Sequence, residues 1–109
     1  MDLNDVSTNL ESTIMELIIN AGESKNLAMQ ALACAKKGEW DNIEKLLEQS
    51  SEAAKRAHKV QTEFIGMDEG VGKVPITLIM VHAQDHIMTA MLARELIEEL
   101  IHIHRQLQS

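Results

Sequence analysis

One apolar stretch with a short polar step at its centre decides the fold: Ile76-Thr77-Leu78-Ile79-Met80-Val81-His82-Ala83-Gln84-Asp85-His86-Ile87-Met88-Thr89-Ala90-Met91-Leu92. At 100° per residue, four of its polar side chains share one helix face at i, i+3, i+4 and i+7: His82, Asp85, His86 and Thr89. Leu78, Leu92 and Leu96 continue that stripe in both directions. Imidazole and carboxylate groups are costly where a core or an interface should be. Such groups are tolerated mainly where chemistry or metal binding uses them.

The composition narrows the class of protein. The 109 residues, with a formal charge of −7, make one domain spanning residues 1–109, near the size at which association helps stability. An acidic chain is a poor partner for nucleic acid or for an anionic membrane surface. Trp40 and Phe64 are the only aromatic residues apart from histidines, and there is no Tyr. Base-stacking platforms and sheet-rich folds are therefore disfavoured.

The single cysteine and the N-terminus point to a cytoplasmic protein. Cys34 has no partner for an internal disulfide, and its apolar neighbours predict a buried thiol in a reducing compartment. The N-terminus is acidic and polar and lacks the pattern of a secretion signal. No apolar run is long enough to insert into a membrane.

Three helical patterns, separated by two breaks, predict an all-α, up-down-up bundle. The first runs from about Asn4 or Asp5 to Lys37, with apolar residues at steps of three and four from Val6 onward, and ends at Gly38. The second begins near Trp40 and fades at Gly66. A flexible loop over residues 67–73 precedes the third, which runs from about Pro75 to Gln106. Each helix of ~30 residues is ~45 Å long.

The third helix carries too much apolar surface for a three-helix monomer. Besides the stripe of Leu78, Leu92 and Leu96, other faces carry Ile79, Ile87, Met91, Leu100 and Ile101. Two neighbouring helices cover only one side of it, and a helix apolar nearly all round is buried nearly all round. We therefore expect a homo-oligomer with this helix at its centre.

Spacing alone does not decide the chemistry of the polar segment from His82 to His86. A neutral imidazole can act as a nucleophile and carry a phosphoryl group, and Asp85 can orient an imidazole or bind a hard cation. His82 and His86 have a spacing that can hold zinc, but no further ligands are recognisable. The pattern is not that of zinc proteases, because Ala83 stands where their glutamate would be. The remaining alternative is a hydrogen-bonded polar cluster that fixes helix register.

Other polar residues carry weaker signals. His58 beside the core face of the second helix is more often a packed residue, and His102 and His104 face opposite ways near the C-terminus. Lys55 and Arg56, with the acidic residues Glu95, Glu98 and Glu99, are most simply solvated helix faces. Gly22 inside the first helix costs ~1 kcal/mol relative to Ala. It is either a point of close approach or a tolerated weak spot.

The run from Val81 to Thr89, followed by Met91-Leu92-Ala93-Arg94-Glu95-Leu96, closely resembles the active-site helix of the enzyme IIA component of the lactose/cellobiose family. These proteins belong to the sugar phosphotransferase system of bacteria. The resemblance extends to Leu17-Ile18-Ile19-Asn20-Ala21-Gly22, to Ala57-His58-x-x-Gln61-Thr62 and to the glycine-bearing loop, and so covers nearly the whole chain.

The resemblance implies a phosphocarrier. His82 would take a phosphoryl group from the carrier protein HPr as a tele-phosphohistidine and pass it to a cysteine of enzyme IIB, which acts with the membrane component IIC. The family fold implies a homotrimer of three-helix subunits. Asp85 would share one Mg²⁺ per trimer with its two copies. His86 and Gln84 are the supporting residues expected at the transfer site, and Gln61 or His58 could approach.

The sugar itself cannot be predicted, because this component never touches it. The sequence looks more like cellobiose or diacetylchitobiose members than lactose ones. The alternative from another class is a non-enzymatic oligomeric helical bundle, in which the histidines and Asp85 form a structural metal site.

Overall fold

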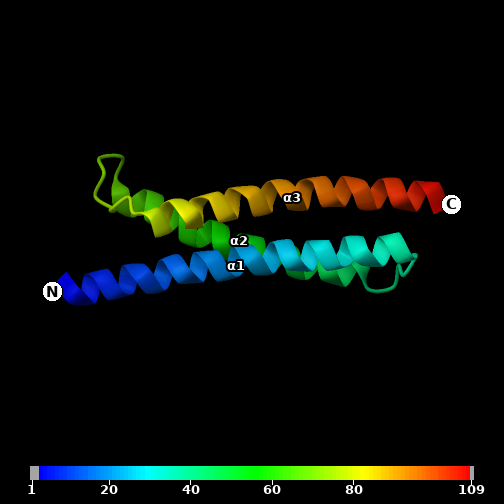
Figure 1. Cartoon of the computed structure of the whole chain (residues 1–109), viewed down its shortest axis with the longest axis horizontal. Coiled ribbons are helices and arrows are strands. Elements are labelled where there is room, and N and C mark those ends of the chain that lie inside the picture. Colours follow the sequence, from blue (N-terminus) through cyan, green and yellow to red (C-terminus); the bar gives the residue numbers. More distant parts are fainter. Residues whose placement is uncertain (1–2, 109) are drawn as a thin grey trace.

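The computed structural model describes the backbone of residues 3–108 and the side chains of residues 10–108, so the side chain of Val6 lies outside the description. Three helices, α1 (Leu3–Lys37), α2 (Ile43–Asp68) and α3 (Leu78–Gln108), run up, down and up. Figure 1 shows the two termini at opposite ends of a rod of 60 × 21 × 19 Å. The predicted all-α, up-down-up subunit is confirmed.

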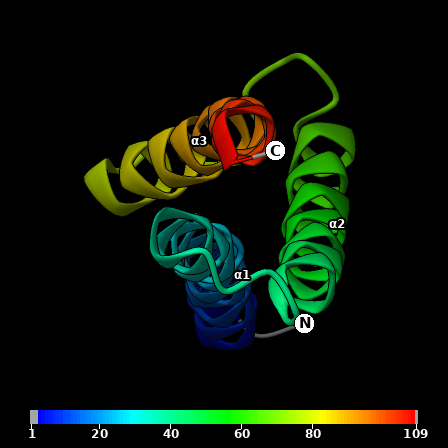
Figure 2. The ribbon, with the colours of Figure 1, turned by 90° about the vertical axis from the view of Figure 1, so that its right-hand side faces the viewer.

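The helices do not contact one another equally. Seen along the rod in Figure 2, they occupy the corners of a triangle, and the loop after α2 arches over to α3. α1 packs closely against both α2 and α3, whereas α2 and α3 touch each other much less. The α2–α3 side of the bundle is therefore its most open side.

The core is divided into two parts by a polar pair. Ser24 of α1 and Ser50 of α2 are buried, and each hydroxyl donates to the other residue's backbone carbonyl, at 2.9 and 2.7 Å. One apolar cluster lies on the side of the α2–α3 loop and contains Leu17, Phe64, Met80, Ala83 and Ile87 among others. The second contains Ala28, Ala31, Ala35, Ile43, Ile97 and Ile101.

The end of α1 follows the prediction. Gly38 has φ +74°, its N–H donates to the Ala35 carbonyl at 3.1 Å, and the Glu39 N–H donates to the Cys34 carbonyl at 2.9 Å. This is the Schellman arrangement, in which a left-handed residue satisfies the last helical carbonyls. Cys34 itself is only half-buried, so the prediction of a buried thiol was wrong in degree. Its neighbour Ala35 is fully buried, so Cys34 lies at the edge of the face of α1 that packs inward.

Two helices begin three residues later than predicted. α2 starts at Ile43 rather than near Trp40, because Trp40 is used elsewhere: its indole N–H donates to Gln108 at 2.9 Å and its ring lies under Arg105. α3 starts at Leu78 rather than at Pro75, because Thr77 caps it by accepting the Met80 N–H at 3.3 Å. A hydroxyl in that position satisfies a helical N–H that has no intrahelical partner.

The predicted loop is confirmed, although it begins later, since α2 continues to Asp68. Its backbone is organised around that residue. The Asp68 carboxylate accepts the backbone N–H of Val74 at 3.0 Å and that of Gly72 at 3.4 Å. The loop therefore holds a defined path into the first turn of α3.

Candidate functional site

His82 lies in the second turn of α3, on the side of that helix that faces away from α1 and α2. It is exposed, whereas its neighbour Ala83 is fully buried in the core. Because Thr77 fixes the start of α3 and Ala83 packs inward, the His82 ring is held in a set direction from a rigid helix. The helical spacing predicted that His82 shares a face with Asp85, His86 and Thr89; His82, Asp85 and Thr89 are exposed together, whereas His86 is half-buried.

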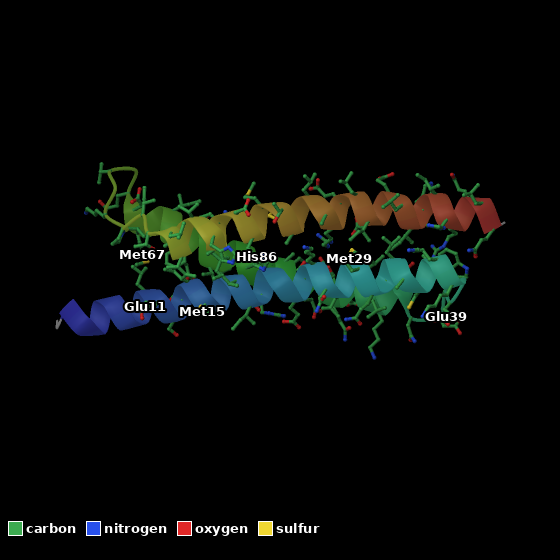
Figure 3. All side chains as sticks on the ribbon, in the orientation of Figure 1. Glu11, Met15, Met29, Glu39, Met67 and His86 are labelled. Carbon is green, nitrogen blue, oxygen red and sulfur yellow. The ribbon has the colours of Figure 1, made fainter. Side chains whose placement is uncertain are left out.

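His82 and His86 are brought together one turn apart. Their ring centroids are 5.5 Å apart and the rings are nearly parallel, with an interplanar angle of 19°. Unlike His82, His86 is half-buried, and it is the labelled residue that points from α3 toward α1 in Figure 3. One imidazole of the pair thus faces outward while the other supports it from the α1 side.

Gly22 on α1 has no side chain, and this leaves space for the His86 ring. A Cβ atom added at Gly22 would lie 3.5 Å from Nε2 of His86, which is ordinary van der Waals contact. Any side chain longer than Ala would reach into the space beside the imidazole. Of the two interpretations that the sequence left open, close approach is the one the structure supports.

Gln84 lies on another side of α3 from His82. Residues two apart on a helix are separated by about 200°, and Gln84 accordingly faces α2. Its Oε1 accepts a hydrogen bond of 2.8 Å from Nε2 of Gln61, and its own Nε2 lies 3.9 Å from the sulfur of Met80. Within one subunit, Gln84 is therefore held by α2 and is not directed at the His82 ring.

Asp85 is exposed on the same outward side as His82. The Thr89 hydroxyl donates to the Asp85 backbone carbonyl at 2.8 Å, but among the described residues the Asp85 carboxylate has no partner. No group of three or more His, Cys, Asp or Glu side chains that could hold a metal occurs within the described part of the chain. A metal at Asp85 would therefore need carboxylates from further subunits.

The outward side of α3 is otherwise apolar. Leu78, Leu92 and Leu96 are 86%, 56% and 55% exposed, and Ile103 and Leu107 continue the row. We call this row, together with His82, Asp85 and Thr89, the outer face of α3. On α1, the exposed residues Met15, Ile19 and Met29 add further uncovered apolar surface. This agrees with the predicted surplus of apolar surface on the third helix.

A second apolar surface was missed at the loop end of the molecule. Exposed apolar side chains gather where α2 ends and α3 begins: Ile65, Met67, Val71, Ile76 and Leu78. A cavity of about 240 Å³ opens there, and its lining includes Phe64, Met80 and Gln84. Its sequence signal was the presence of apolar residues outside the periodic stripes, in and beside the predicted loop.

The remaining histidines take no part in this arrangement. His58 is exposed on α2 and borders the α2–α3 side rather than the His82–His86 pair. His102 is exposed and lies 3.1 Å from the Gln106 amide, while His104 is half-buried. Gln61, by contrast, contacts α3 through its hydrogen bond to Gln84. Over the described residues, no helix is long and apolar enough to cross a membrane.

An outward-facing imidazole on a rigid helix, supported by a second imidazole and ringed by apolar side chains, can accept and release a group from docked partner proteins. The three-helix fold and this exposed imidazole pair suit a helical carrier subunit.

Comparison with known proteins assigns the carrier to a family. Residues 12–105 match the family model described as "PTS system, Lactose/Cellobiose specific IIA subunit". The chain is 45% identical over its full length to the N,N'-diacetylchitobiose-specific EIIA component of Escherichia coli K12, covering 99% of that protein. It is 37% identical to the lichenan-specific enzyme IIA component of Bacillus subtilis, with 90% of this chain and 89% of that protein covered.

Solved structures give the same assignment. The cellobiose-specific enzyme IIA of Bacillus anthracis superposes with a TM-score of 0.85 at 35% identity, covering 90% of each chain. The Escherichia coli chitobiose IIA in its complex with HPr superposes with a TM-score of 0.80 at 48% identity, over 92% of this chain and 97% of that one. The chain belongs to the lactose/cellobiose-specific IIA family of the sugar phosphotransferase system, and is a phosphocarrier component of it.

Proposed function

We propose that His82 is the phosphoryl acceptor, that the donor is phospho-HPr and that the acceptor is a cysteine of enzyme IIB. The observation that carries the proposal is the exposure of His82 on a rigid helix, next to His86, in a chain similar over its full length to a chitobiose-specific EIIA component. The Escherichia coli relative solved with HPr supports the choice of donor. Such an exchange takes place in the cytoplasm, where both soluble partners act.

The transfer is an exchange between two nitrogen atoms and then between nitrogen and sulfur. The lone pair of Nε2 of neutral His82 attacks the phosphorus, a new N–P bond forms, and the N–P bond of the donor breaks with its electron pair returning to the donor imidazole. In the second step the thiolate of the acceptor attacks, an S–P bond forms, and His82 leaves as neutral imidazole. The protein contributes mainly alignment of the reacting atoms and stabilisation of the phosphoryl oxygens.

His86 and Gln84 are the supporting residues in this proposal. His86 can donate a hydrogen bond to a phosphoryl oxygen on His82, because the two rings stack one turn apart. Gln84 faces α2 within its own subunit, so its amide reaches a phosphoryl group only after turning away from Gln61 or from a neighbouring subunit. The exchange therefore relies first on His82 and second on His86.

We further propose that the subunits form a homotrimer with α3 at its centre. In such a trimer the leucines of the outer face would bury one another and the Asp85 carboxylates would approach a common axis, while His82, at the edge of this face next to His86, would stay open to partner proteins. Three carboxylates brought together repel strongly unless a cation neutralises them, and oxygen ligands suit Mg²⁺. The unpartnered Asp85 carboxylate in an apolar row fits such a site. The cation would neutralise charge at the axis and take no part in the transfer.

The class of transported sugar is inferred from the names of the similar proteins. These include diacetylchitobiose, cellobiose and lichenan systems, and the proposed transported molecule is a disaccharide of the cellobiose, chitobiose or lactose type. The sugar meets other components of the system, and nothing in this chain contacts it.

Incubation with phosphoenolpyruvate, enzyme I and HPr, followed by intact mass spectrometry, tests the proposal. A phosphocarrier gains one acid-labile phosphate per chain, and addition of enzyme IIB removes it. The alternative, a structural helical bundle with a His/Asp metal site, gains none. A chain that remains unmodified under conditions in which HPr is fully phosphorylated overturns the proposal.

A further inference from the structure

A basic groove lies on the open side of the bundle, between α2 and α3. Its cavity of about 310 Å³ is lined by Lys55, His58 and Lys59 of α2 and by Met91, Arg94 and Glu95 of α3, among others. The weak contact between α2 and α3 leaves room for it. Because the chain as a whole is acidic, the gathering of positive charge at this point calls for a physical explanation.

The charge of the groove opposes that of the protein. The chain has 10 Lys and Arg residues and a net charge of −7, yet three of these cations line this one cavity, with Glu95 as its only acidic residue. Among the described residues, neither Lys55 nor Lys59 forms an ion pair. Glu98 pairs with Arg94, but the charges of Lys55 and Lys59 have no such partner, so an anion that enters the groove would reduce the repulsion between the cations.

Arg94 supplies a second, independent observation. Its side chain is only 25% exposed, and its Nη2 forms an ion pair of 3.3 Å with Glu98. Its Nε, however, is buried and has no hydrogen-bond partner among the described residues. A buried donor without an acceptor is costly and uncommon in native proteins, so the Nε–H of Arg94 is available to an acceptor, either a water or an anion.

We propose that this groove binds a small oxyanion of the phosphate class. After a rotation that brings the guanidinium of Arg94 toward the cavity, its Nε–H would donate to one oxygen of the anion. The ammonium groups of Lys55 and Lys59 would neutralise the charge, and the His58 imidazole is within the same lining. Charge-assisted hydrogen bonds from arginine to phosphate oxygens are among the strongest that proteins make. The groove that the sequence presented as two solvated faces becomes one binding site when α2 and α3 face each other.

The oxyanion site is separate from the phosphoryl-transfer site. Neither His82, Gln84, Asp85 nor His86 lines the groove, and Arg94 lies twelve residues beyond His82, or about 18 Å along α3. Binding in the groove therefore does not depend on phosphorylation of His82. A variant lacking the His82 imidazole should bind the anion as well as the natural chain does.

The test follows the side-chain N–H resonance of Arg94 Nε by NMR while inorganic phosphate is added to the full-length protein at constant ionic strength set with chloride. We expect a saturable shift of that resonance. Arg94→Lys keeps the charge and removes the Nε donor, and should weaken binding about tenfold when followed through the backbone amides of α2 and α3. Lys55→Gln with Lys59→Gln should weaken it by a similar factor. Lys25→Gln, an exposed lysine on α1, is the matched control and should change nothing.

Titration with a hexose 6-phosphate then separates the two sources of the anion. Equal affinity for this ester and for inorganic phosphate assigns the site to free phosphate, and tighter binding of the ester assigns it to a phosphomonoester. A shift that is linear and no larger than with chloride alone overturns the proposal, as does equal binding by the natural chain and the double lysine variant. That variant changes two exposed side chains, so it remains informative even if Arg94→Lys perturbs folding.

Discussion

Both faces of α3 carry a row of apolar side chains, but only one of the two rows is covered within the subunit. The inner face carries Met80, Ala83, Ile87, Ala90, Ile97 and Ile101, all buried against α1 and α2. The outer face carries a comparable row of leucines and isoleucines that nothing in the subunit covers. All the charged or reactive groups of the candidate site, except His86 at the edge, lie on or next to the outer face.

The difference shows how one helix serves both stability and function. A polar group on the inner face would need a partner inside the core, as Ser24 and Ser50 show, whose buried hydroxyls each donate to the other residue's carbonyl. On the outer face, His82 keeps its ring free for a docked partner while the surrounding apolar surface favours contact with further protein. The predictions below act on one face at a time.

The largest expected effect follows from removing the outer-face nucleophile. His82→Ala or His82→Gln should abolish phosphorylation by phospho-HPr, because no other group takes the same position. Helicity by circular dichroism and oligomeric mass should stay essentially unchanged, since His82 is exposed. Intact mass spectrometry measures the phosphate. If such a variant still gains one phosphate per chain, the nucleophile is another residue, and His86 is the first to examine.

Charge placed on the outer face should break the assembly. Leu92→Glu combined with Leu96→Glu would bring like charges together on every copy, so the protein should become monomeric at micromolar concentration. Sedimentation equilibrium should give the mass of three chains for the natural protein and of one for the variant. Gln49→Glu, on the exposed surface of α2, is the control for added charge alone. A natural protein that is a clean monomer would refute the trimer.

A cavity on the inner face should lower stability without touching the chemistry. Ile87 is 1% exposed, and Ile87→Ala should reduce the free energy of unfolding by about 2–5 kcal/mol. Chemical denaturation at fixed protein concentration measures the loss, because the stability of an oligomer depends on concentration. Phosphorylation of the folded fraction should continue. Gln49→Ala, at an exposed position of α2, provides the comparison and should cost far less than 1 kcal/mol, as is usual for surface changes.

Gly22 links the inner side of the bundle to the histidine pair. Gly22→Ala should be tolerated and should raise stability by up to about 1 kcal/mol, because the added Cβ only contacts His86 and the helix propensity improves. Gly22→Leu should push the His86 ring away from α1 and slow phosphorylation of His82 while the subunit still folds. Quenched time courses of phosphorylation measure the rate for each variant. A slower rate for Gly22→Leu alone would show that the effect comes from the space beside the His86 imidazole and not from helix propensity. Equal rates for Ala and Leu would show that His86 does not need this space.

The sequence was sufficient for the number, order and direction of the helices, because period and breaks are local properties. It missed the starts of α2 and α3 by three residues, since these depend on what Trp40 and Thr77 contact in the folded chain. It also identified the surplus of apolar surface on the third helix. Which stripe becomes the core depends on how α1 and α2 pack, and that is not a local property.

In the candidate site, too, local features could be predicted from the sequence and contacts between helices could not. His82, His86 and Asp85 could be placed on one helix from spacing alone, because they lie within two turns. The contact of Gly22 with His86 and the hydrogen bond of Gln61 to Gln84 join residues from different helices. Pairings of that kind have no signature in a single sequence. The basic groove could not be predicted from the sequence for the same reason, because its lysines and Arg94 belong to two helices.

The smallest effect concerns the charge at the centre of the outer face. If three Asp85 carboxylates meet around a cation, chelation at neutral pH removes the cation, restores their repulsion and should lower the melting temperature by a few degrees, or about 1 kcal/mol. Asp85→Leu replaces the three charges by apolar surface that continues the row of Leu78, Leu92 and Leu96, so the trimer should form without metal and ignore the chelator. His82 should remain phosphorylatable in this variant, since its chemistry needs an aligned imidazole and not the axial charge. Thermal melts of both proteins, with and without chelator at one protein concentration, measure the effect. Equal sensitivity of the two would show that Asp85 does not bind the cation, because a leucine side chain has no oxygen to offer it.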